Sequence, residues 1–113
     1  MDTTRQQKIG RMLQKELSEI FLTEVRAIGH GILLTVTNVR ITPDLRIARV
    51  YLSIFPGNQS ETILERIKEN TKSIRFQLGT RVRSQLRIIP ELVFYMDDSL
   101  DYIENIDHLL NKE

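Results

Sequence analysis

The side chains best able to act on a partner are positively charged and gather in the second half of the sequence. Residues 66–87 contain seven Lys or Arg and a single acid, Glu69, which gives a net charge of +6. Residues 91–113 contain seven acids and one Lys, a net charge of −6, while the whole chain carries only +1. Such segregation of charge predicts a polyanionic partner for the basic segment.

Several of these cations are spaced to share one face of a helix, since Lys68, Lys72, Arg75 and Arg83 follow at steps of four, three and eight residues. A row of cations suits phosphate, because each neutralised phosphate releases condensed counterions. The alternative is a solvated helix whose arginines pair with the acidic segment that follows. The candidate nucleic-acid contacts are Lys68, Lys72, Arg75, Gly79, Arg81, Arg83 and Arg87.

Gly79 lies in the same row, four residues from both Arg75 and Arg83. A glycine inside a helix costs about 1 kcal/mol relative to alanine. Close approach of a sugar-phosphate backbone would explain it, and so would tight packing against another element or an end of the helix at this point. The sequence leaves these explanations open.

Residues suited to catalysis or metal binding are sparse. The chain has no cysteine, which excludes disulfides, thiolate zinc sites and thiol nucleophiles. His30 and His108 are distant in sequence. Asp97, Asp98 and Asp101 could hold magnesium in a metal-dependent phosphodiesterase, although capping of a following helix explains the same residues. We expect a protein that is not an enzyme and binds no metal or cofactor.

The first element that positions these residues is a helix from about Thr4 to Arg26. Its apolar residues recur every three or four positions, which predicts one buried face. Two glycines around His30 end it. The buried face comprises Ile9, Met12, Leu13, Leu17, Ile20, Phe21 and Val25, and beside it runs a secondary basic stripe of Arg5, Lys8, Arg11 and Lys15.

Residues 32–55 predict a β-hairpin, with Pro43 in the turn "TPDL". In its second arm one face is apolar and the other is mixed, so the sheet covers a core on one side. The alternating apolar positions are Ala48, Val50, Leu52 and Ile54, and the other face carries Ile47, Arg49, Tyr51 and Ser53.

A second helical region follows, and Asn58 with Glu61 fits a capping box at its start. Its apolar positions are Ile63, Ile67, Ile74, Leu78, Val82 and Leu86. Their regular spacing falters near residue 70, where polar residues that are weaker helix formers predict a kink or break. The kink residues are Asn70, Thr71 and Lys72.

"PELVFYM" predicts a third strand that opens at Pro90, and residues 97–110 predict a short amphipathic helix capped by Asp98 or Ser99. Each element has one apolar face to bury, which predicts an α+β fold with helices on one face of a three-stranded sheet. With 113 residues, we expect a single domain, 1–113, and a monomer. No stretch approaches the roughly 18 apolar residues of a membrane span, and the expected location is cytoplasmic.

Two stretches carry a family resemblance. "TPDLRIARVYLS" and "LRIIPELVFYMDDS" resemble bacterial ribosome-binding factor A, and the similarity covers about residues 4–110. The resemblance implies a KH-like domain of the type II order, with helix, two strands, an interrupted helix pair and a third strand. It also implies a non-enzymatic factor that binds the 30S subunit and 16S ribosomal RNA, and assists late maturation, 5′-end processing and growth in the cold.

One departure from the family concerns the helix interruption. The family places an Ala-x-Gly element there, and the resemblance aligns it with Asn70, Thr71 and Lys72. The small residues that would let RNA approach the kink closely are absent, which leaves open whether this element contacts RNA. A competing hypothesis is a protein-interaction module that uses the acidic carboxy-terminal helix, with Asp101, Glu104 and Asp107 as its charged residues.

Overall fold

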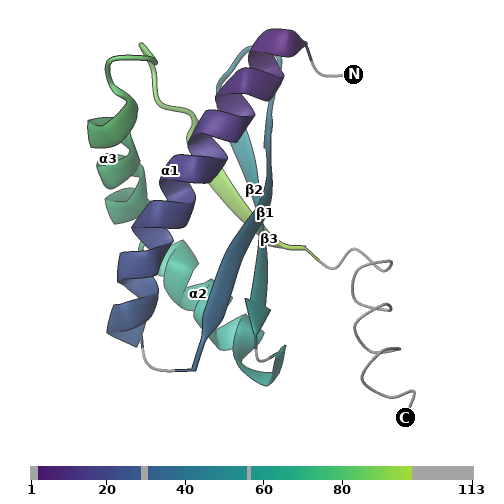
Figure 1. Ribbon diagram of the computed structural model, residues 1–113, viewed down its shortest axis with the longest axis vertical. Coiled ribbons are helices and arrows are strands. Elements are labelled where there is room, and N and C mark those ends of the chain that lie inside the picture. Colours follow the sequence, from purple (N-terminus) through teal and green to yellow (C-terminus); the bar gives the residue numbers. More distant parts are fainter. Residues whose placement is uncertain (1–2, 29–30, 56, 98–113) are drawn as a thin grey trace.

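The computed structural model describes residues 3–28, 31–55 and 57–97 (Figure 1). The expected order is confirmed as far as the third strand, and the expected last helix lies outside the described residues, as do His30 and His108. The elements are α1 (Thr4–Ile28), β1 (Leu33–Ile41), β2 (Ile47–Phe55), a 3-10 turn (Gly57–Gln59), α2 (Ser60–Glu69), α3 (Thr71–Val82) and β3 (Glu91–Met96).

The three strands form one mixed sheet in the order β1-β2-β3. β1 runs antiparallel to β2, and β3 runs parallel to β2 because the α2–α3 pair carries the chain back across the sheet. Strand register shifts between Val36 and Asn38, where β1 contains a bulge. The one-sided α+β architecture agrees with the expectation from the residue pattern, and the element order agrees with the KH-like order that the family resemblance implies.

A tight turn joins β1 to β2, and Pro43 is its second residue. The Leu45 N–H donates to the Thr42 carbonyl at 2.8 Å, and Leu45 adopts a positive φ of 62°. The hydroxyl of Thr42 and then the backbone N–H of Arg46 donate to the Asp44 carboxylate, and these bonds lower the pKa of Asp44 below its usual value. The turn sets the register in which the hairpin arms pair.

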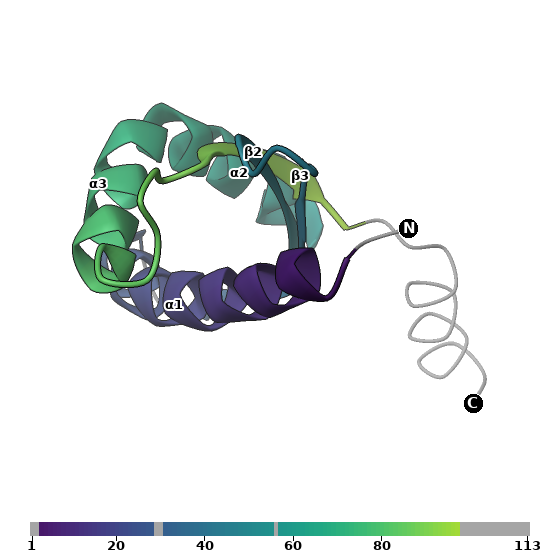
Figure 2. The same cartoon turned by 90° about the horizontal axis from the view of Figure 1, so that it is seen from above.

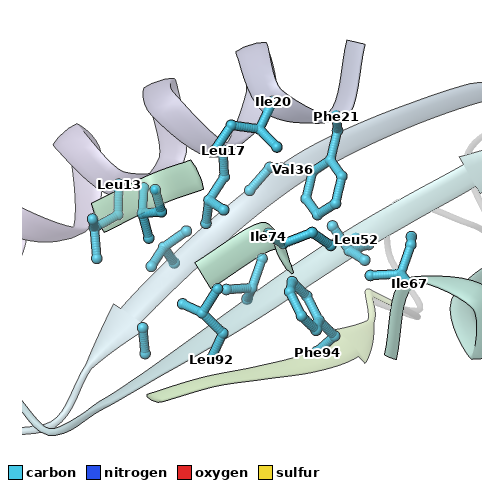
Figure 3. Close-up of a cluster of buried hydrophobic side chains, with 14 of the residues drawn as sticks. Leu13, Leu17, Ile20, Phe21, Val36, Leu52, Ile67, Ile74, Leu92 and Phe94 are labelled. Atoms are coloured by element: carbon cyan, nitrogen blue, oxygen red, sulfur yellow. The ribbon is translucent and has the colours of Figure 1, made fainter. Parts of the chain in front are cut away.

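The core lies between the helices and one face of the sheet (Figures 2 and 3). The rings of Phe21 in α1 and Phe94 in β3 meet edge to face, with centroids 6.0 Å apart. α1 also lies very close to β1: a Cβ added to Gly10 would be 2.7 Å from the Val39 carbonyl oxygen. The labelled core residues are Leu13, Leu17, Ile20, Phe21, Val36, Leu52, Ile67, Ile74, Leu92 and Phe94.

The expected interruption of the second helical region is present. α2 ends at Glu69, Asn70 has φ −100° and ψ 13°, and α3 begins at Thr71. The side-chain amide of Asn70 donates to the Arg66 carbonyl at 2.8 Å, and the Thr71 hydroxyl donates to the Lys68 carbonyl at 2.8 Å. These side chains satisfy carbonyls at the end of α2, which is the local competition with helix that their types predict.

Two details of this helical region differ from the prediction. The expected capping box of Asn58 and Glu61 is wrong, because α2 begins one residue later than that cap requires, its N-cap is Gln59, and no side chain caps it. The 3-10 turn precedes α2 instead, and the Ser60 hydroxyl donates to the Gly57 carbonyl. α3 ends at Val82, so Leu86 lies beyond the helix and packs against the core from the connection to β3.

Candidate nucleic-acid interface

An open depression of about 550 Å³ lies beside the helix break. It sits where the end of α2 and the first turn of α3 pass the start of β3, so the break itself positions its walls. Three of its side chains are exposed cations and two are acids, which leaves a net positive lining. The lining residues are Lys68, Glu69, Thr71, Lys72, Arg75, Glu91 and Leu92.

Arg75 is held in place by the backbone of the connection between α3 and β3. Its Nη2 donates to the Ile89 carbonyl at 2.6 Å, and its Nε donates to the Pro90 carbonyl at 3.0 Å. These carbonyl acceptors orient the guanidinium without neutralising its charge. A guanidinium has five N–H donors, so others remain for a ligand.

Lys68 and Lys72 flank the break on its two sides, and both are exposed. Within the described part of the chain, Lys68, Lys72 and Arg75 form no ion pair with a carboxylate. We call Lys68, Lys72 and Arg75 the kink surface. Their positive charge is therefore available to an anionic partner.

Gly79 lies one turn further along α3 and faces the same connection. A Cβ added there would meet Cγ1 of Ile89 at 3.4 Å, which is close packing with a neighbouring element. Of the explanations that the sequence left open, tight packing is the one this geometry supports. The connection occupies the side of Gly79 that an approaching sugar-phosphate backbone would need.

Arg81 is on another side of α3, where it faces α1. Its Nη1 forms two ion pairs, with Oε1 of Glu19 at 2.7 Å and Oε1 of Glu16 at 3.1 Å. Hydrogen bonds to Glu19 and then Glu16 raise the pKa of Arg81 above its usual value. Arg81 is thus separated from the kink surface and has internal partners for its charge.

Four further cations lie near the amino-terminal end of α1. Arg87 lies in the α3–β3 connection and shares a hollow with Arg5 and Arg46, while Lys8 and Arg5 border a neighbouring hollow. We call Arg5, Lys8, Arg46 and Arg87 the α1-end surface; Arg46 forms an exposed ion pair of 4.0 Å with Asp44, which lines the same hollow. Arg11 and Lys15 of the secondary stripe are exposed further along α1, and Arg83 is exposed just after α3. The basic residues therefore form two surfaces rather than one row.

Sequence reasoning missed two groups of residues. Arg46 was overlooked because it reaches the α1-end surface only when the hairpin folds against α1. The mixed face of β2 was recognised, but its Tyr51 was not linked to a tyrosine on β3. The sequence signal for that link is period-two alternation in both strands, which places Tyr51 and Tyr95 on the same uncovered face.

The alternative sites depend mostly on residues outside the described ranges. Of the three aspartates considered for magnesium, only Asp97 is described, and its carboxylate accepts a hydrogen bond from the Thr37 hydroxyl. Within residues 3–28, 31–55 and 57–97, no three potential metal ligands cluster. Asp101, Glu104 and Asp107 also lie outside, so the protein-interaction hypothesis stays a prediction. No described helix is both long and apolar enough to cross a membrane.

Comparison with known proteins gives consistent matches over most of the chain. The family model for ribosome-binding factor A matches residues 5–110. Ribosome-binding factor A of Cytophaga hutchinsonii is 45% identical over 112 residues, covering 99% of this chain and 84% of that protein. The Flavobacterium johnsoniae protein of the same name is 51% identical over 111 residues, covering 97% and 85%.

Solved structures agree with the sequence comparison. The crystal structure of ribosome-binding factor A from Thermus thermophilus has a TM-score of 0.64 at 26% identity, covering 80% of this chain and 94% of that one. A homology model of the Thermus thermophilus factor, fitted into a cryo-electron microscopy map of its 30S complex, has a TM-score of 0.59 at 27% identity, covering 76% and 88%. The fold, the match across residues 5–110 and the relatives at 45–51% identity show that this chain belongs to the ribosome-binding factor A family.

Proposed function

We propose that this protein binds the 30S ribosomal subunit through 16S ribosomal RNA and assists late maturation of the subunit, including processing of the 5′ end of 16S RNA. Family membership supports the ribosomal partner, and the related Thermus thermophilus factor has been fitted into a map of a 30S complex. The single observation that carries the RNA contact is the kink surface, an exposed group of cations without carboxylate partners among the described residues.

The kink surface would contact phosphates rather than read bases. Lys68 and Lys72 are long, exposed cations that can follow a phosphodiester backbone, and each neutralised phosphate would release condensed counterions. Arg75 is already oriented by the Ile89 and Pro90 carbonyls, so less conformational freedom is lost when it binds. The kink residue Lys72 thus contributes charge to the site, although this chain lacks the small residues that the family resemblance implies there.

The proposed action is binding without catalysis. A factor that prefers one conformation of immature 16S RNA raises the population of that conformation in proportion to its differential affinity. The protein would act as a monomeric single domain in the cytoplasm, with the exposed α1-end surface adding phosphate contacts. RNA structure is strongly stabilised in the cold. Cells that lack this protein should therefore show the greatest impairment of growth at low temperature.

Sedimentation of a lysate through a sucrose gradient tests this function. We expect the full-length protein to move with free 30S subunits, and cells that lack it to accumulate 16S RNA with an unprocessed 5′ end. A protein that stays at the top of the gradient at low salt, together with normal 5′ ends in the deletion strain, would contradict the proposal. Recovery of a protein partner without ribosomal RNA would instead favour the interaction module.

A further inference from the structure

The face of the sheet that the described helices leave uncovered carries a pair of stacked tyrosines. Tyr51 in β2 and Tyr95 in β3 are register partners, and their rings stack with centroids 5.4 Å apart and planes 23° from parallel. The helices lie on the opposite face (Figure 2). Tyr95 is 40% exposed and lies on an edge strand, so no further described strand covers the far side of its ring.

Two arginines adjoin the tyrosines on the same face. Arg49 precedes Tyr51 by two residues on β2, which places both side chains on one side of the strand. Arg40 of β1 is the register partner of Arg49, and both are exposed. Like charges directly opposite each other on neighbouring strands destabilise a sheet. No carboxylate of the described residues forms an ion pair with either arginine. An anionic ligand would remove this repulsion.

This face also carries acids on or just after β3. Beyond Tyr95, the Asp97 carboxylate accepts a hydrogen bond from the Thr37 hydroxyl. Glu91 precedes Tyr95 by four residues on β3, so strand alternation places it on this face too, near the Arg49 end, where it also borders the depression at the kink surface. On this face the paired arginines Arg40 and Arg49 are the groups that would attract a phosphate. A bound chain would therefore place its phosphate over the arginines and its base over the tyrosines.

We propose that this face binds single-stranded RNA, with a nucleobase stacked on Tyr95 and the adjoining phosphate held between Arg40 and Arg49. Aromatic rings on an open sheet flanked by cations are suited to unpaired bases, whose flat faces are free to stack. In a duplex those faces are already stacked, so paired RNA would gain only the phosphate contact. The inference rests on the proposed function for RNA as the partner, and adds a contact separate from the kink surface.

Binding of short RNAs to the full-length protein tests this placement. The probes are a fluorescently labelled, unstructured 12-nucleotide RNA and a duplex of the same length, each followed by fluorescence anisotropy. Tyr95→Leu and the Tyr51→Leu/Tyr95→Leu pair remove the stacking surface, whereas Tyr95→Phe keeps it. Loss of one stacked base should weaken single-strand binding roughly 5- to 150-fold in the leucine variants. Tyr95→Phe should stay within about twofold of the unaltered protein.

Photocrosslinking gives a second readout that needs no substitution. Ultraviolet irradiation of the unaltered protein with the same single-stranded RNA should crosslink a nucleotide to the peptide that contains Tyr95. Thermal melting of each variant checks that the fold persists, which is expected because both side chains lie outside the core.

Several results would overturn this inference. One is undiminished binding by the leucine variants. Another is equal affinity for single-stranded and duplex RNA. A third is no binding of the single strand by the full-length protein, as would follow if a protein partner occupied the face. These results are distinguishable from failure of the proposed function, because association with 30S subunits through the kink surface would persist in each case.

Discussion

At the first turn of α3, Lys72 and Arg75 are exposed cations, and the guanidinium of Arg75 is held by backbone carbonyls. At the last turn of the same helix, Arg81 is an exposed cation held by the carboxylates of Glu16 and Glu19. Carbonyl partners orient a charge and leave it positive, whereas carboxylate partners cancel it. Whether a cation can bind a polyanion therefore depends more on its own partners than on its presence in a basic segment.

Removing the two lysines of the kink surface should have the largest effect on binding. If each lysine neutralises one phosphate, a slope of about 0.9 per contact predicts that Lys68→Gln/Lys72→Gln weakens 30S association about 30-fold near 0.15 M salt. Both side chains are exposed, so the melting temperature should change little. The affinity can be measured by co-sedimentation with purified 30S subunits. An affinity within twofold of the unaltered protein would show that the cations near the start of α3 contribute no more to binding than Arg81 near its end.

The role of the carbonyl partners can be sharpened with Arg75→Lys. Lysine keeps the charge but cannot reproduce the two donations to Ile89 and Pro90. We expect a loss of about 1–2 kcal/mol in the free energy of unfolding, measured with urea. Binding to 30S subunits should fall severalfold, because the charge is no longer held in one orientation. An unchanged free energy of unfolding together with an unchanged 30S affinity would show that the two hydrogen bonds do not orient the charge of residue 75 for binding.

Gly79→Ala separates packing from close approach of RNA. Alanine gains about 1 kcal/mol of helix propensity, and its Cβ would be in van der Waals contact with Ile89 at 3.4 Å, so stability should shift by no more than about 1 kcal/mol in either direction. Binding to 30S subunits should not change, because the α3–β3 connection already lies against this residue. A large loss of affinity in a variant of normal stability would mean that RNA approaches α3 at Gly79.

The smallest effect is expected from Arg81→Gln, which is the matched control for the lysine variants. It removes one positive charge from the same helix, but that charge already faces Glu16 and Glu19. We expect less than a twofold change in 30S affinity at the same salt concentration. A loss as large as that for one kink lysine would place Arg81 in the interface and contradict the comparison.

Much of the fold could be predicted because it depends on periodicity. Alternation from Ala48 to Ile54 identified the buried face of β2, and the polar residues at 70 and 71 marked the helix break. The capping-box prediction was wrong because a 3-10 turn occupies Gly57–Gln59, and so short a turn has no recognisable period in the sequence. Local pattern thus predicts elements and their buried faces better than it predicts their ends.

The candidate site was less predictable because it depends on neighbours far apart in sequence. Helical spacing shows that Arg75 and Arg81 point in different directions, but not that one meets the carbonyls of residues 89 and 90 and the other the acids of α1. It also could not place Arg46 beside Arg5 and Arg87. Charge counting found the basic segment, and only tertiary contacts separated its cations into distinct surfaces.

The most direct test of the central claim is the salt dependence of 30S association for the unaltered protein and for Lys68→Gln/Lys72→Gln. A plot of the logarithm of affinity against the logarithm of salt concentration should be linear, and the double variant should reduce the slope by about two. Arg81→Gln should run parallel to the unaltered protein. Parallel lines for all three proteins would show that the kink surface contacts no phosphate, and would contradict the account.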